Sequence, residues 1–86
     1  MYKLTLTRDA QKFYEQADAP LVRRLHRCFG HLRENPYEHP SIKRLRGPLV
    51  GYFRYRVGDW RVVYHVDEEK HVVTILLVAH RSEVYR

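Results

Sequence analysis

The chain has 86 residues, which is enough for one small domain spanning residues 1–86 and leaves no room for a second. Sixteen lysines and arginines oppose ten acidic residues, so the formal net charge is +6 at pH 7, and 44% of the residues are apolar. This composition excludes a chain that is disordered throughout. The sequence contains no signal-peptide pattern and no apolar run of membrane length, so we expect a cytoplasmic protein without a membrane partner.

The first half of the chain predicts one strand and two helices. Apolar and polar residues alternate over residues 2–7, which is the pattern of a half-buried strand. Thr7 suits the N-cap of a first helix. Pro20 suits the first residue of a second helix, with Asp18 or Ala19 before it, and this helix ends near Asn35. Cys28, the single cysteine, falls on the apolar stripe of the second helix. We therefore expect a buried thiol and a reducing compartment.

The second half predicts a loop and three strands. Residues 36–51 contain three prolines and two glycines, so a loop is expected from Tyr37 to Pro48, with a short turn at residues 42–45. Gly58-Asp59 separates two runs of alternating side chains, which predicts a tight β-hairpin. Residues 72–79 are almost entirely apolar, as in a central strand covered on both faces.

The order strand, helix, helix, strand, strand, strand predicts an α+β fold. We expect the two N-terminal helices to pack on one face of a small, mainly antiparallel sheet of four strands. The other face of this sheet is then left for solvent or for a ligand. No internal repeat, low-complexity segment or linker interrupts the order of elements.

A two-residue turn at Gly58-Asp59 also predicts which hairpin residues share a face of the sheet. Arg56 then lies opposite Arg61, and Val57 lies opposite Trp60. Because side chains alternate along a strand, one face is apolar and belongs to the core. Its members are Phe53, Tyr55, Val57, Trp60, Val62 and Tyr64. The other face carries Tyr52, Arg54, Arg56, Arg61, Val63 and His65.

Three arginines on one face of a hairpin indicate an anionic ligand. Like charges directly opposite each other destabilise a sheet by roughly a few tenths of a kcal/mol. A guanidinium is permanently charged and can bind two phosphate oxygens at once. The alternative is a solvated or salt-bridged row of arginines, in which Arg56 pairs with an acidic residue at the sheet edge. The basic residues of this part of the chain are Lys43, Arg44, Arg46, Arg54, Arg56 and Arg61.

Three further candidates follow the last predicted strand. His80, Arg81 and Tyr85 are expected at a strand end, where functional groups are common. A histidine exchanges a proton near neutral pH, and a tyrosine can orient or stack a substrate, although a terminal histidine and tyrosine often do neither. The other histidines lack the spacing of a metal site. The sequence also contains no glycine-rich phosphate loop and no catalytic carboxylate pair, so we expect no metal ion.

The stretch from Leu45 to Tyr64 reads LRGPLVGYFRYRVGDWRVVY, and the chain ends in AHRSEVYR. Together they resemble the RelE/ParE superfamily of toxins from type II toxin–antitoxin systems, and most closely its RelE-type mRNA interferases. The likeness extends over nearly the whole chain, because the order of helices and strands also agrees. It implies a RelE-like fold and a ribonuclease that needs neither a metal ion nor a cofactor.

RelE-type toxins, in their best-studied form, enter the ribosomal A site and cut the messenger there. The resemblance implies attack of a ribose 2′-hydroxyl on the adjacent phosphate, which leaves a 2′,3′-cyclic phosphate and a 5′-hydroxyl. Arg61 is similar to the arginine that stabilises the phosphorane, Arg81 to the residue at the leaving oxygen, and Tyr85 to a late tyrosine that orients or stacks the substrate. Arg54 occupies the position of a catalytic basic residue. The residues expected to bind RNA around this centre are Arg56, Lys43, Arg44 and Arg46.

Two positions depart from the RelE pattern. Tyr52 stands where RelE-type toxins carry one active-site lysine, and Arg54 replaces another lysine. Arginine does not readily release its proton, so Arg54 is poorly suited to act as a general base. Tyr52, His65 or His80 would have to supply the base, or the reaction relies mainly on charge stabilisation and positioning.

Two other functions are compatible with the same fold. One is a ParE-type toxin that poisons DNA gyrase without cutting RNA. The other is a domain that has lost toxicity and persists as an interaction module. Under either toxin interpretation we expect a cognate antitoxin that forms a hetero-oligomer with this chain through an acidic or amphipathic segment. The ribonuclease interpretation adds the ribosome and mRNA as partners.

Overall fold

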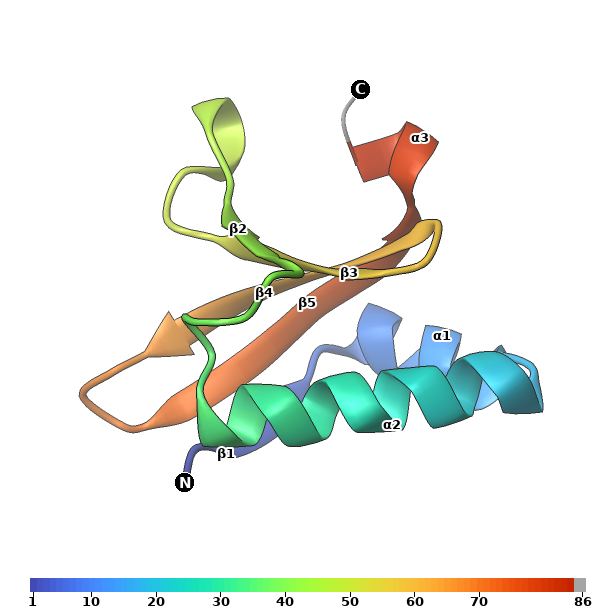
Figure 1. Ribbon diagram of the computed structural model, residues 1–86, viewed down its shortest axis with the longest axis horizontal. Coiled ribbons are helices and arrows are strands. Elements are labelled where there is room, and N and C mark those ends of the chain that lie inside the picture. The colour runs from blue at the N-terminus through green and yellow to red at the C-terminus, as the bar shows by residue number, and fades with distance from the viewer. Residues whose placement is uncertain (85–86) are drawn as a thin grey trace.

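The computed structural model describes residues 1–84, and its elements follow the predicted order with three short additions. The elements are β1 (Lys3–Leu6), α1 (Arg8–Gln16), α2 (Ala19–Glu34), β2 (Ile42–Arg44), the 3-10 helix η1 (Gly47–Leu49), β3 (Phe53–Val57), β4 (Trp60–Asp67), β5 (Val72–His80) and α3 (Arg81–Val84). The additions are β2, η1 and α3. Helices α1 and α2 lie on one side of the sheet, so the fold class is α+β as predicted (Figure 1).

Helix α1 begins where the sequence predicts, and α2 begins one residue before the predicted Pro20, at Ala19. The Thr7 hydroxyl accepts a hydrogen bond from the N–H of Ala10, and the Asp18 carboxylate accepts one from the N–H of Leu21. Pro20 lies in the first turn of α2, where its missing N–H costs nothing. These side chains satisfy backbone donors that a helix start leaves unbonded, which explains why the helices start there.

The sheet has five strands and not the expected four. Their order is β1-β5-β4-β3-β2, with β1 parallel to β5 and every other pair antiparallel. The extra strand, β2, lies in the segment that was expected to be a loop with a turn at residues 42–45. Its three residues pair with β3, Lys43 opposite Arg54. A three-residue strand has too little alternation to be recognised in a sequence, and its hydrogen bonds come from a distant partner.

The register of the β3–β4 hairpin agrees with the prediction. Arg56 lies opposite Arg61, and Val57 opposite Trp60, on either side of the two-residue turn. Gly58 has a φ of 61°, whereas Asp59 does not have a positive φ, which is the pattern of a type II′ turn. The turn therefore gives the two strands one register and separates their side chains into two faces.

The helix-facing side of the sheet holds the core. The apolar hairpin residues predicted for this face pack with α1 and α2. The buried members of the core are Ala10, Leu25, Cys28, Phe29, Leu32, Tyr55, Val57, Val62, Tyr64, Val73, Ile75 and Val78. Cys28 is buried, which confirms the expectation of a buried thiol, and this burial raises the pKa of the thiol well above its ordinary value.

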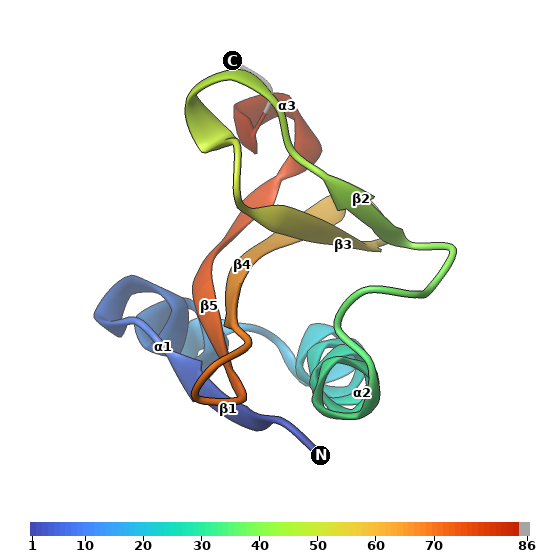
Figure 2. The same cartoon turned by 90° about the vertical axis from the view of Figure 1, so that its left-hand side faces the viewer.

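Two segments stand over the opposite side of the sheet. The connection that contains η1 lies towards one end, and α3 lies towards the other, both on the side away from α1 and α2 (Figures 1 and 2). The N–H of Arg81 donates to the carbonyl of Asp59 at 2.9 Å, so the start of α3 is tied to the hairpin turn. Within residues 1–84, no helix is long and apolar enough to cross a membrane.

The positive φ of Gly58 leads to a prediction about stability. Gly58→Ala should lower the free energy of unfolding by about 1–2 kcal/mol, because an L residue is strained at this positive φ. The added Cβ would also lie 2.8 Å from Nη2 of Arg24, whose side chain would have to move. The matched control is Gly30→Ala inside α2, where nothing lies within 4 Å of the new Cβ. That change should raise the free energy of unfolding by about 0.5–1 kcal/mol.

Urea denaturation of the two glycine variants measures both free energies. Opposite signs are expected for the two substitutions. If Gly58→Ala is as stable as Gly30→Ala, the turn does not need a positive φ at this position.

Candidate active site

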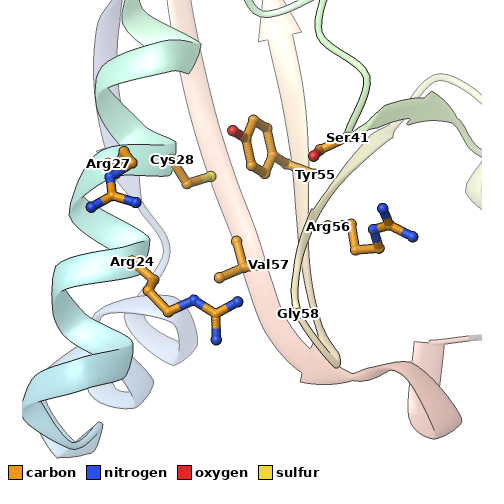
Figure 3. Close-up of a pocket in the computed structure, with 8 residues that line it drawn as sticks. All are labelled: Arg24, Arg27, Cys28, Ser41, Tyr55, Arg56, Val57 and Gly58. Carbon is orange, nitrogen blue, oxygen red and sulfur yellow. The ribbon is translucent and has the colours of Figure 1, made fainter.

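The three hairpin arginines lie on the side of the sheet that faces away from the helices, as predicted. We call this side the arginine face; its hairpin residues are Tyr52, Arg54, Arg56, Arg61, Val63 and His65. Figure 3 shows the alternation on β3, where Tyr55 and Val57 point towards Cys28 on α2 and Arg56 points to the other side. The sequence pattern alone was sufficient to place these side chains.

Two of the three arginines are buried, so of the two expected uses of this face, solvent or a ligand, exposure to solvent does not apply to them. Arg54 is only 8% exposed and Arg61 only 9% exposed, whereas Arg56 is exposed. Val63, which lies between them on the same face, is 1% exposed. The η1 connection and α3 stand over this side of the sheet, which a pattern of side chains along single strands does not reveal (Figure 1).

Each of the two buried guanidinium groups donates hydrogen bonds to backbone carbonyls through its own Nη1 atom. Nη1 of Arg61 donates to the carbonyl of Gly58 at 2.8 Å and to the carbonyl of Trp60 at 3.0 Å. Nη1 of Arg54 donates to the carbonyl of Ser41. The Nε–H of each arginine is buried and has no hydrogen-bond partner. Nε and Nη2 together form the side of a guanidinium that grips two oxygens of one phosphate.

No carboxylate neutralises these groups within the part of the chain that the structure describes, because the one ion pair found there joins His71 and Glu68. A salt-bridged or solvated row of arginines therefore does not describe Arg54 and Arg61. A buried donor without a partner costs about 1–3 kcal/mol, and more if it is charged. Nearly all buried polar groups in proteins are bonded, so these two unpaired donors make Arg54 and Arg61 candidates for binding an anion.

Arg81 is connected to the same hairpin turn. It is exposed and begins α3, and its N–H is the donor to the Asp59 carbonyl. The neighbouring carbonyls of Gly58 and Trp60 hold the guanidinium of Arg61. Three successive carbonyls of one turn thus contact the two arginines. Tyr85 lies outside the described residues, so its predicted role stays a prediction.

The candidate bases are divided between the two sides of the sheet. Tyr52 and His65 belong to the arginine face, with ring centroids 5.8 Å apart in an edge-to-face arrangement. His80 pairs with Trp60 across β4 and β5, and their rings lie 5.6 Å apart on the helix-facing side. The structure therefore does not bring His80 to Arg54 and Arg61. His80 is the last residue of β5, so the expected strand end is confirmed, but the alternation of the strand places its side chain on the helix-facing side.

The other basic candidates are also divided. Lys43 is exposed and lies next to Arg54 in the β2–β3 register, and Arg46 is exposed at the start of η1. Arg44 lies on the opposite side, where its guanidinium is 5.6 Å from the centre of the Phe53 ring. Arg44 is therefore not brought together with Arg54 and Arg61.

A small cavity of about 150 Å³ lies on the helix-facing side, between α2 and the hairpin (Figure 3). Arg24 and Arg27 line it, and the guanidinium of Arg24 reaches towards Gly58. Both arginines are exposed, so water can satisfy their donors. Among residues 1–84, no group of three or more histidine, cysteine or acidic side chains could hold a metal ion. The arginine face is accordingly the better candidate for a site.

The sequence gives no direct sign of the groups that hold the arginines. These are the backbone carbonyls of Ser41, Gly58 and Trp60, and every residue type carries such a carbonyl. The tight turn at Gly58 was predicted, but not that its carbonyl accepts a bond from Arg61. Ser41 lies in the segment that was expected to be a loop, where no pattern predicts the direction of a carbonyl.

Comparison with known proteins agrees with the fold and with the predicted resemblance. The sequence model of the ParE toxin of type II toxin–antitoxin systems, parDE, matches residues 4–85. Toxin RelE of Mycobacterium tuberculosis (strain ATCC 25618 / H37Rv) is 42% identical over 82 residues, which are 95% of this chain and 79% of that protein.

Solved structures show the same similarity. A chain in the crystal structure of the RelBE2 toxin–antitoxin complex from M. tuberculosis is 31% identical, with a TM-score of 0.80 over 93% of this chain and 98% of that chain. The isolated E. coli RelE toxin is 28% identical, with a TM-score of 0.79 over 99% of this chain and 92% of that chain. The chain therefore belongs to the ParE toxin family of type II toxin–antitoxin systems.

Proposed function

We propose that this protein is an endoribonuclease that cleaves mRNA, at the ribosomal A site, and thereby inhibits translation. The observation that carries the proposal is the pair of buried guanidinium groups of Arg54 and Arg61, each with a free Nε–H. An RNA phosphate is an anion of suitable shape for this pair. Identity of 42% to a toxin named RelE supports the ribonuclease over the other members of the superfamily.

The proposed reaction is attack of a ribose 2′-hydroxyl on the adjacent phosphorus. The 2′-oxygen forms a bond to phosphorus and loses its proton, while the bond to the 5′-oxygen breaks. The products are a 2′,3′-cyclic phosphate and a 5′-hydroxyl. Negative charge increases on the non-bridging oxygens at the phosphorane stage, so fixed positive donors stabilise that stage more than the ground state.

Arg61 and Arg54 are suited to this stabilising role because their guanidinium groups are fixed before substrate binds. Each is held by Nη1 on backbone carbonyls, and each keeps its Nε–H for the phosphate. In a buried site such donors are worth more than in water. Arg54 keeps its proton and therefore acts through its charge. Lys43, Arg46 and Arg56 are exposed and can bind neighbouring phosphates of the RNA.

The two proton transfers need other groups. We assign the removal of the 2′-hydroxyl proton to Tyr52 or His65, which share the arginine face and contact each other edge to face. His80 is a poorer candidate because it lies on the helix-facing side. Arg81 stabilises the charge on the leaving 5′-oxygen, which takes its proton from water to become the 5′-hydroxyl. Tyr85 orients or stacks the substrate.

A second candidate function is the poisoning of DNA gyrase without RNA cleavage. It is favoured by the matched family, which is described as the ParE toxin, and by Tyr52 and Arg54, which replace two lysines of the RelE pattern. A site that lacks both lysines can still bind phosphate through its arginines but has fewer groups that can accept the 2′-hydroxyl proton. The same arginine face could then bind DNA or an acidic protein surface.

We also propose that a cognate antitoxin neutralises the protein. Chains of the same fold have been crystallised as the RelBE2 complex of M. tuberculosis and the intact RelBE complex of E. coli. With a net charge of +6, this chain is suited to bind an acidic segment.

Single arginine substitutions test the ribonuclease. Arg61→Ala and Arg81→Ala should each lower the rate of mRNA cleavage by about 100-fold or more, because each removes a donor to developing charge. Primer extension on messenger from induced cells measures the cleavage. Arg56→Ala is the matched control, since this arginine lies on the same face but is exposed, and it should cost only a few-fold. Thermal unfolding shows whether Arg61→Ala still folds; wild-type cleavage by both variants would refute the assignment.

Cleavage of mRNA and poisoning of DNA gyrase can be distinguished in the same induced cells. If the protein is a ribonuclease, growth arrest should come with new messenger ends and intact chromosomal DNA. The ends should carry a 5′-hydroxyl downstream of the cut, which a 5′-phosphate-dependent exonuclease does not degrade. DNA breaks with intact messenger would reverse the choice in favour of gyrase.

The antitoxin proposal is tested by the neighbouring genes. Co-expression of a small protein encoded next to this chain should restore growth, and the two proteins should purify together as a hetero-oligomer. Addition of 1 M salt should weaken the complex if the attraction of opposite charges contributes, since the screening length is then about 3 Å. Strong expression of this chain alone, without growth arrest, would instead support a non-toxic interaction module.

A further inference from the structure

The carbonyl that holds Arg54 belongs to a turn of unusual construction. The N–H of Ile42 donates to the carbonyl of His39 at 2.9 Å, which closes a β-turn with Pro40 at its second position. The N–H of Ser41 donates to Nδ1 of the His39 ring at 3.1 Å. The side chain of the first turn residue thus binds the backbone of the third, as an asparagine does in an Asx-turn.

This turn determines where the carbonyl of Ser41 points. That carbonyl accepts hydrogen bonds from the N–H of Arg56, at 3.0 Å, and from Nη1 of Arg54. The first of these bonds joins the turn to β3, and the second holds the guanidinium on the arginine face. The N–H of Ile42 belongs to the same peptide unit as the Ser41 carbonyl. The backbone carbonyl of His39 therefore binds the peptide unit between Ser41 and Ile42, and the ring of His39 binds the N–H of Ser41.

The ring of His39 is itself fixed from the helix-facing side. Its Nε2 lies 3.3 Å from the hydroxyl of Tyr55, which lies 2.7 Å from Nδ1 of His31 on α2. The rings of His31 and His39 are stacked, with centroids 4.9 Å apart. Figure 3 shows Tyr55 pointing from β3 towards α2, with Ser41 beside it. A continuous path of contacts thus leads from α2, through the sheet edge, to Arg54.

The hydrogen-bond directions along this path are consistent. A backbone N–H can only donate, so Nδ1 of His39 is unprotonated and Nε2 carries the proton that is donated to Tyr55. The hydroxyl of Tyr55 then donates to Nδ1 of His31. Burial raises the pKa of Tyr55 above its ordinary value, so its hydroxyl keeps this proton. Each of these contacts thus pairs one donor with one acceptor.

We propose that His39 is a positioning residue for Arg54, which acts by orienting the Ser41 carbonyl that anchors the guanidinium. The role of Arg54 in RNA cleavage rests on the proposed function, but the structural link between His39 and Arg54 does not. Loss of the ring acceptor leaves the N–H of Ser41 without a partner, so the turn that carries the Ser41 carbonyl loses one of its three hydrogen bonds, and the guanidinium is held less firmly. Fixed donors stabilise a transition state because they do not have to reorient during the reaction.

Two substitutions at one position separate this role from a general packing role. His39→Ala removes the acceptor for the Ser41 N–H. His39→Asn removes the ring and its contacts with Tyr55 and His31 but places an oxygen acceptor where Nδ1 was. His39→Ala should therefore lower the kcat of RNA cleavage by about threefold to tenfold, as expected for one lost hydrogen bond, with little change in KM. His39→Asn should recover most of the rate.

The control variants are His26→Ala and Arg54→Ala. His26 is exposed on α2 and outside this path, so its substitution should change neither kcat nor KM. In the Arg54→Ala background, His39→Ala should have no further effect, because two residues that act through one group are not additive. Full additivity of the two losses would overturn the proposal. Thermal unfolding of each variant ensures that only folded protein is compared.

A measurement without RNA tests the link itself. The side-chain Nε–H signal of Arg54, identified by its loss in Arg54→Lys, should shift or broaden in the nitrogen–proton NMR spectrum of His39→Ala and remain near its original position in His39→Asn. If the signal is unchanged in His39→Ala, His39 does not position Arg54, whatever the activity. If the signal responds as expected but the wild-type protein does not cleave RNA, the positioning role holds and the proposed function fails.

Discussion

A two-residue turn at Gly58-Asp59 is the constraint on which the rest of this structure depends. It allows one register between β3 and β4, and a slip of one residue would move every side chain to the wrong face. In the observed register the apolar side chains pack against α1 and α2, and the arginines lie together on the other side. The carbonyls of the same turn bind Arg61 and the start of α3. One short segment therefore organises both the core and the candidate site.

The candidate site is costly to the fold. Two like charges lie opposite each other at Arg56 and Arg61, and the buried guanidinium groups of Arg54 and Arg61 each keep an unbonded Nε–H. Backbone carbonyls reduce this cost at Nη1 but not at Nε. A site that is incomplete in the free protein is stabilised by the anion that completes it. Under the proposed function, the cost of the unfilled site and its affinity for phosphate have the same physical origin.

The two layers of the molecule are not independent. The helices cover only one side of the sheet, yet His31 on α2 is linked through Tyr55 and His39 to the Ser41 carbonyl that holds Arg54. At the nearby hairpin turn, the Asp59 carbonyl links the hairpin to Arg81. Both anchors are backbone carbonyls at strand ends, where the rigid sheet restricts their movement. The arginine side chains of the site are thus held by backbone atoms of the sheet and its turns, and not by other side chains.

Much of this could be predicted from the sequence, because it depends on interactions between residues close in the chain. The caps at Thr7 and Asp18, the hairpin register and the two faces of β3 and β4 follow from local hydrogen bonds and from side-chain alternation. The resemblance to the RelE/ParE superfamily was also visible in the sequence. The same rules were sufficient to predict that Arg54, Arg56 and Arg61 lie on one face of the sheet.

The tertiary structure decided what depends on distant contacts. Strand β2 exists because β3 offers it hydrogen bonds, and the burial of Arg54 and Arg61 depends on which segments stand over the sheet. Because β5 continues through His80, the side chain of His80 lies on the face opposite to the arginines. The sequence alone determined which charged groups share a face, since alternation is a local property. Which of them are buried, and which carbonyls hold them, is set by packing between segments far apart in the chain.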